Sequence, residues 1–247
     1  MWSNHDILDA WESTRGLSAA HRGRALVRLA RPTLSATQVA GLSVGQADRA
    51  LLELRRGVIG PQQDATAVCP SCAERVEFSF SLDMVLATPD DDAAPATNER
   101  TVMVGEYTCA FRLIRPDDLE AAAAASSVSA ARQCLAARCL TRVAIAGVVQ
   151  TGLAALPEPV IDAIAQAMAD ADPLADLRFD LTCPSCGHGW SDRFDALSCL
   201  WQEIESLGWR LLEHVHMLAS AYGWSERDIL ALPAQRRAFY LSCVGGS

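Results

Sequence analysis

The sequence predicts an α+β fold, in which a small antiparallel, zinc-ribbon-like β core carries an α-helical insertion and flanking N- and C-terminal helices. Three observations support this prediction. The tetrapeptide CPSC occurs twice, at Cys69–Cys72 and at Cys183–Cys186. Alternating apolar and polar residues, typical of half-buried strands, surround both copies. The other segments show helical spacing of apolar residues, and a chain of 247 residues that is 50% hydrophobic can bury a sizeable core.

The N-terminal segment, residues 1–60, is predicted to be helical. Apolar residues recur at helical spacing across residues 5–30, which we interpret as one helix. A second helix is expected from about Gln46 to Arg56, since Gly57 is a natural C-terminal stop.

Residues 61–116 and 174–198 are predicted to form the two halves of the split β core. Val76, Phe78 and Phe80 alternate with polar residues in a strand that leaves the first cysteine pair. A similar alternation enters the second pair, and residues 101–116 are expected to form a hairpin that turns near Gly105-Glu106. Each cysteine pair thus lies in a strand–turn–strand unit, which indicates a short internal duplication.

The insertion, residues 117–173, is predicted to be helical. Its first part is rich in Ala, which has the highest helix propensity, and Asp117 or Asp118 is placed to cap it. Its second part carries one apolar stripe and ends near Pro173. The stripe consists of Val160, Ile164 and Met168.

The C-terminal segment, residues 199–247, is also predicted to be helical. Apolar residues step by three and four from Trp201 to Tyr222, which indicates one amphipathic helix of roughly six turns that ends at Gly223. Ser225 begins a capping box for a short helix, and a last helix follows a Leu-Pro break.

The two cysteine pairs form the strongest candidate site. Structural zinc needs four thiolate or imidazole ligands in a tetrahedron, and two Cys-x-x-Cys turns supply four. The predicted Zn²⁺ ligands are Cys69, Cys72, Cys183 and Cys186. The pairs lie much farther apart than the usual roughly 15–20 residues, but loop-closure entropy grows only logarithmically with length. Gly187 suits a turn that needs positive φ, whereas Ala73 at the equivalent place in the first copy is less suitable.

Two other interpretations of the cysteine pairs remain. Each pair could be a redox device, but a thioredoxin-like pair begins a helix and neither copy is followed by a helical pattern. The ribbon could also be degenerate and hold no metal. His188 is expected to lie beside the ligands or on the surface, because four cysteines already complete the shell. A zinc ion with four thiolates has no open position for water, so the site is expected to be structural and the protein no enzyme.

Charge and composition restrict the partners and the location. The net charge of −9 argues against broad attraction to nucleic acid, and each cysteine turn is followed by an Arg offset by an acid. A zinc-ribbon nucleic-acid-binding or regulatory adaptor protein nevertheless remains the alternative function. No run of eighteen apolar residues is present, so no membrane span is expected. The N-terminus does not have the pattern of a secretory signal, and the odd number of cysteines favours a reducing, cytoplasmic setting.

Several phrases of the sequence carry a family resemblance. They are ILDAWE (Ile7–Glu12), ADRALLELRRGVIGP (Ala47–Pro61), YGWSERDIL (Tyr222–Leu230) and LPAQRRAFYL (Leu232–Leu241). Together they resemble the T-even-type phage baseplate hub and hub assembly chaperone family, as found in contractile injection systems. The resemblance implies a non-enzymatic structural or assembly protein with baseplate, hub or spike proteins as partners. It further implies a cytoplasmic protein that either becomes part of a phage-tail-like particle or leaves as a chaperone.

The last helix supplies a candidate surface for such partners. Arg236, Arg237, Phe239 and Tyr240 lie close together in the sequence, so some of them must face outward. We predict a partner-docking patch here, with burial of the same stripe in the core as the alternative.

Overall fold

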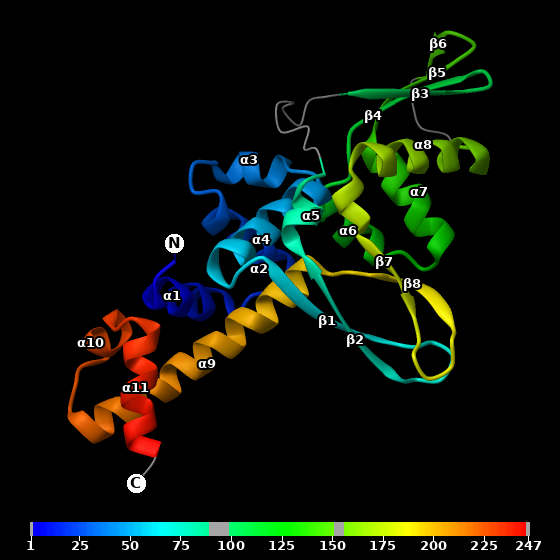
Figure 1. Ribbon diagram of the computed structural model, residues 1–247. Helices are drawn as coiled ribbons and strands as arrows, with labels where there is room; N and C mark the ends of the chain where they lie inside the picture. The colour runs from blue at the N-terminus through cyan, green and yellow to red at the C-terminus, as the bar shows by residue number, and fades with distance from the viewer. Residues whose placement is uncertain (1, 89–98, 151–155, 246–247) are drawn as a thin grey trace.

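The computed structural model describes residues 2–88, 99–150 and 156–245. It combines helices with small antiparallel sheets in an elongated arrangement (Figure 1). Helix α9 (Ala196–Tyr222) runs from a pair of β-hairpins to the C-terminal helices, and the N-terminal helices lie along it. A separate sheet lies at the opposite end of the molecule. Within the described ranges, no helix is long and apolar enough to cross a membrane.

Four helices form the N-terminal segment, and a serine caps each of them. They are α1 (Asn4–Thr14), α2 (Ala19–Ala30), α3 (Ala36–Gly41) and α4 (Val44–Val58). The single helix predicted for residues 5–30 is wrong: the Ser18 hydroxyl accepts a hydrogen bond from the His21 backbone N–H and begins a second helix. Helix α4 is longer than predicted and contains Gly57.

The main core lies where α1, α2 and α4 pack on the first half of α9. Trp11, Leu26, Leu51 and Ile204 are among its buried members. Gly208 allows the close approach of α1, because a Cβ atom at this position would lie 2.8 Å from the Trp11 ring. The glycine in the apolar stripe of α9 is therefore a packing requirement.

Two β-hairpins leave this helical core side by side (Figure 1). The first consists of β1 (Gln62–Val68) and β2 (Arg75–Ser81), and the second of β7 (Arg178–Thr182) and β8 (Gly189–Arg193). They remain two separate two-stranded sheets. Aromatic rings join them: the centroids of Phe80 and Phe179 are 4.3 Å apart, and Phe194 meets Phe80 edge-on at 5.2 Å. Helix α5 (Leu82–Leu86) follows β2.

The predicted hairpin does turn at Gly105-Glu106, between β3 (Arg100–Val104) and β4 (Tyr107–Phe111). It does not join the cysteine hairpins, as the predicted core of residues 61–116 required. It pairs with β5 (Leu140–Ile145) and β6 (Val148–Val149) in a four-stranded sheet. The prediction of a purely helical insertion over residues 117–173 is therefore wrong. The strand β5 reads LTRVAI, whose β-branched residues suit a half-buried strand.

The helices of the insertion cover this sheet. They are α6 (Pro116–Ala123), α7 (Val128–Cys139) and α8 (Glu158–Ala171), followed by the 3₁₀ turn η1 (Pro173–Asp176). The predicted stripe of α8 is confirmed, since Val160, Ile164 and Met168 are buried against a core that includes Phe111. The Ala-rich stretch forms two helices, because Ser127 caps a new one.

The buried Asp118 carboxylate connects several segments of this part of the chain. Its carboxylate accepts hydrogen bonds from Arg112 at 2.6 and 3.0 Å, from Arg138 at 2.8 Å and from the Arg115 backbone N–H at 2.9 Å. Burial favours a raised pKa for Asp118, but these hydrogen bonds outweigh it and hold the pKa well below the usual range. The predicted helix-capping role of Asp118 is thus combined with two ion pairs.

The C-terminal segment follows the prediction closely. Helix α9 ends at Gly223, which has a φ of 68°, and Ser225 caps α10 (Glu226–Ala231). The last helix, α11 (Ala234–Gly245), packs back on α9. Both breaks are local, since a glycine and a proline determine them.

We predict that Asp118→Asn lowers the free energy of unfolding by about 3 kcal/mol at pH 7, because it leaves two arginines beside a neutral amide. In the wild type, a depressed carboxyl pKa contributes stability above the unfolded pKa of about 3.9, and this contribution is lost as the pH falls through the folded pKa. Urea unfolding at several pH values measures both effects. The control is Asp162→Asn, which removes an exposed ion pair with Arg132 and should cost at most about 1 kcal/mol. Equal losses for the two variants would contradict the prediction.

We also predict that Gly208→Ala lowers the free energy of unfolding by about 1–3 kcal/mol, because the new methyl group collides with Trp11. Gly57→Ala is the matched control: it lies in α4 with open space around the added carbon, and should be neutral or stabilising by about 0.5 kcal/mol. Thermal unfolding of the two variants provides the comparison, and the prediction fails if Gly208→Ala is the more stable one.

Candidate metal centre

The two CPSC turns have the same backbone structure. In the first, the Cys69 N–H donates to the Glu74 carbonyl and the Ala73 N–H donates to the Cys69 carbonyl, both at 2.9 Å. In the second, Cys183 and His188 form the equivalent of the first bond, and Gly187 donates to Cys183, again at 2.9 Å. The internal duplication inferred from the sequence is therefore also a duplication of structure.

Each turn requires one residue with left-handed backbone geometry. Gly187 has a φ of 74°, as expected for a glycine, and Ala73 has a φ of 60° at the equivalent place. A side chain in this region costs roughly 1 kcal/mol. The first turn keeps this conformation because closing the hairpin around Cys69 requires it, which agrees with the sequence-based view that Ala73 is the less suitable residue.

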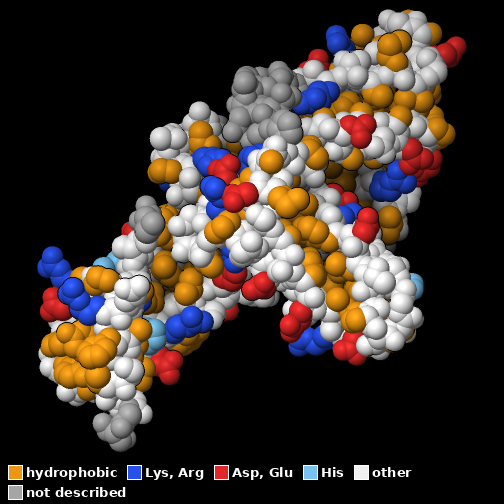
Figure 2. All heavy atoms as spheres, viewed as in Figure 1, with side chains coloured by type: hydrophobic (Ala, Val, Ile, Leu, Met, Phe, Trp, Pro, Cys, Tyr) orange, Lys and Arg blue, Asp and Glu red, His pale blue; other side chains and the backbone are white. Residues whose placement is uncertain are grey.

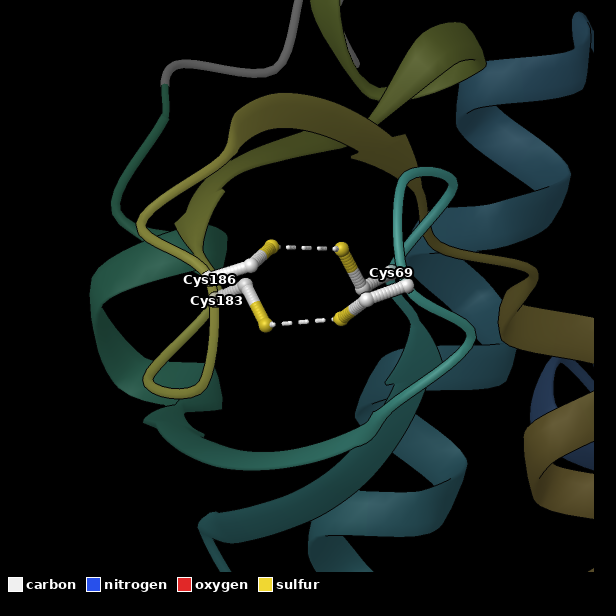
Figure 3. Close-up of side chains that lie close together, drawn as sticks. Cys69, Cys183 and Cys186 are labelled. Atoms are coloured by element: carbon white, nitrogen blue, oxygen red, sulfur yellow. Dashed lines mark hydrogen bonds between the residues drawn. The ribbon is translucent and has the colours of Figure 1, made fainter.

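The structure brings the four predicted ligands together. The Sγ atoms of Cys69 and Cys186 are 3.7 Å apart, and those of Cys72 and Cys183 are 3.6 Å apart (Figure 3). All four sulfur atoms lie within 4.8 Å of one another. With metal–sulfur bonds of about 2.3 Å, the edge of a tetrahedron is about 3.8 Å, so these positions suit a tetrahedral ion.

The site lies at the surface, with one side protected. Cys69 and Cys183 are buried, whereas Cys72 and Cys186 are exposed. Burial alone raises the pKa of Cys183, but the backbone N–H groups of Cys186 and Ser185 outweigh it and lower the pKa to about 7. The second turn thus favours the thiolate of Cys183, which is the form that binds metal. At Cys72 the Glu74 backbone lowers the pKa, but hydrogen bonds with Cys186 and Cys183 outweigh it and raise the pKa to about 12.

His188 is no member of this group of ligand atoms. Its ring stacks on Trp190 at 6.4 Å, on the strand that leaves the second turn. The expectation that His188 lies beside the ligands or on the surface agrees with this position.

Arg55 connects the hairpins with the helical core. Its guanidinium makes a two-point ion pair with Glu203 of α9, at 2.9 and 3.0 Å, and donates to the Gly60 and Gln62 carbonyls at the start of β1. The side chain is 5% exposed. The sequence analysis did not identify this residue, and its acidic partner is distant in the sequence.

The predicted docking patch on α11 is divided by the structure. Arg236 is exposed and Phe239 is 62% exposed, as expected if some of the four residues face outward, whereas Arg237 is buried. Tyr240 is half-buried and meets the Trp224 ring edge-on at 4.8 Å. The helix period explains this division, because adjacent residues of a helix point about 100° apart.

The sequence analysis did not predict the aromatic cluster that the structure shows near the C-terminus. It contains Tyr222, Trp224 and Tyr240, with Trp224 stacked on Tyr222 at 4.8 Å. Hydrophobic side chains gather on this end of the molecule in the space-filling view (Figure 2). The sequence signal was the YGW triplet, in which the glycine turn brings the two rings together.

Fold and site define a mixed helical and β protein, in which two duplicated cysteine hairpins form a metal-binding geometry between distant parts of one chain. A family model described as T4 bacteriophage base plate protein matches residues 24–197, more than two thirds of the chain. The chain belongs to this family. The match includes both cysteine hairpins and ends at the start of α9. Neither a curated protein nor a solved structure matches significantly.

We predict that the purified wild type binds about one equivalent of a divalent metal and that Cys183→Ser loses it, with a loss of several kcal/mol in the free energy of unfolding. Cys243→Ser is the control, since Cys243 is an exposed thiol on the last helix. Elemental analysis and thermal unfolding measure the two effects. A metal-free wild type, or equal behaviour of the two variants, would count against the centre.

Proposed function

We propose that the protein is a non-enzymatic structural or assembly component, of chaperone-like character, in the baseplate or hub of a contractile phage-tail-like injection system. The family match over residues 24–197 is the observation that carries this proposal. The C-terminal resemblance YGWSERDIL…LPAQRRAFYL lies outside the matched residues and supports it separately.

We further propose that the metal is Zn²⁺ and that its role is structural. Four cysteine sulfurs at tetrahedral spacing form the ligand set that zinc commonly occupies in structural sites. When bound, zinc would offset two of the four thiolate charges and form four strong bonds, with no open position for a substrate. The surrounding residues do the rest: the backbone N–H groups of the second turn orient Cys183 as a thiolate, and Arg55 fixes the start of β1.

In this proposal the centre sets the geometry between two surfaces. One end of the molecule exposes Met103, Val148 and Val149 on the four-stranded sheet, and the other exposes Tyr222 of α9 and Phe239 of α11. Exposed apolar groups of this kind are typical of protein contacts. Baseplate, hub or spike proteins are the partners that the family membership supports, with the cytoplasm as the place of assembly.

The nucleic-acid alternative is less well supported. Arg178 and Arg193, the basic residues on the strands of the second hairpin, both pair with Asp176, at 2.8 and 3.4 Å. Paired arginines are less available to phosphates, and the net charge of the chain is −9. We therefore propose protein partners rather than nucleic acid.

The proposal predicts that the tagged protein, coexpressed with baseplate, hub and spike proteins of its own injection system, captures at least one of them at moderate salt. Cys183→Ser should lose this partner, and Cys243→Ser should keep it. Mass spectrometry of finished particles then separates a permanent subunit from a chaperone that leaves. Recovery of nucleic acid instead, with affinity that falls steeply as salt rises, would support the alternative and refute the proposal.

A further inference from the structure

A cavity of about 380 Å³ lies between α1, α9 and α11, away from the metal centre. Its walls combine apolar residues such as Ile7 and Leu211 with the polar heads of Arg210, His214 and Arg237. A water molecule occupies roughly 30 Å³ in the liquid, so the cavity has room for a small ligand group. Basic and histidine side chains lie beside one another on this end of the molecule (Figure 2).

Arg237 is the unusual member of this cavity. It is 8% exposed, and the one hydrogen bond of its side chain is a long one, from Nη1 to the Leu232 carbonyl at 3.4 Å. Within the described part of the chain, no carboxylate makes an ion pair with it. Burial lowers the pKa of Arg237 accordingly. A guanidinium that is buried without a counter-charge destabilises a protein unless a partner arrives to pair with it.

His214 supplies a second, independent observation. Its Nδ1 atom is buried and has no hydrogen-bond partner. Burial is the largest cause that lowers the pKa of His214, and the charge of Arg237 is the next. Arg210 lowers this pKa further, whereas Glu213 raises it. The lowered pKa favours the neutral form of the ring. Arg210 also makes no ion pair among the described residues and is exposed, so the cavity reaches solvent beside it.

We propose that this cavity binds a carboxylate group, held by the guanidinium of Arg237 beside the ring of His214, with Arg210 at its entrance. The flat fork of a guanidinium matches a carboxylate at two points. A single negative charge suits a site with one buried arginine, and the apolar walls can pack against the hydrocarbon part of the ligand. Two sources offer this chemistry, an acidic side chain of a partner protein and a free small carboxylate.

The experiment measures the melting temperature of the full-length protein at pH 7 and constant ionic strength. Sodium acetate and acetyl-Leu-Glu-Leu amide are the carboxylate probes, with sodium chloride, sodium phosphate and the matching Gln peptide as comparisons. A probe at ten times its dissociation constant should raise the melting temperature by about 3 °C. The Glu peptide should bind about tenfold more tightly than the Gln peptide. A response to both carboxylates indicates any small carboxylate, and a response to the peptide alone indicates a protein segment.

The variants test Arg237 itself. Arg237→Met keeps the apolar stem and removes the charge, so it should lose the response to carboxylate. In sodium chloride it should melt at or above the temperature of the wild type, because no buried charge then remains unpaired. The exposed neighbour is the control: Arg236→Met should respond as the wild type does, and all variants should keep their metal.

Three results would overturn the proposal. The first is a wild type that responds to neither carboxylate probe, or that responds to phosphate more strongly than to acetate and peptide. The second is Arg237→Met melting well below the wild type in sodium chloride, since the guanidinium would then already be satisfied in the free protein. The third is an equal response from Arg236→Met and Arg237→Met.

Discussion

The meeting of two cysteine turns from distant parts of the chain is the constraint on which the arrangement depends. Residues 73–182, which contain a whole sheet and three helices of the insertion, leave from one turn and return to the other. Sulfur–sulfur distances of 3.6 and 3.7 Å allow one ion to close this long loop.

Ion pairs with a buried member connect the other neighbouring elements of the fold. Arg55 with Glu203 connects α4, the start of β1 and α9, and Asp118 with two arginines connects β4, α6 and α7. In each case two-point hydrogen bonding joins the charges, and Arg55 and Asp118 make further hydrogen bonds to the backbone. Arg237 breaks this pattern in the described chain. The same physical rule that explains these two connections therefore identifies the cavity on α11 as a place where a partner is missing.

Local patterns succeeded where the residues that determine a structure are neighbours in the sequence. The turn at Gly105-Glu106, the end of α9 at Gly223 and the positive φ of Gly187 all follow from single residues. The pairing of strands was different. The hairpin over residues 101–116 was predicted, but its sequence does not say which further strand becomes its neighbour. The neighbour, β5, lies beyond two helices and was hidden in a segment whose composition is dominated by helix formers.

By itself, the sequence determined the four ligands of the candidate centre, the duplicated hairpins that carry them and the long amphipathic helix α9. These features depend on spacing and on local backbone preference, which a single chain displays directly. Tertiary structure alone decided that the third hairpin belongs to another sheet, that Arg55 finds Glu203, and that Arg237 points inward while Arg236 points out. Such outcomes depend on which distant surfaces meet and on how completely each charge is then removed from water, and no local pattern contains that information.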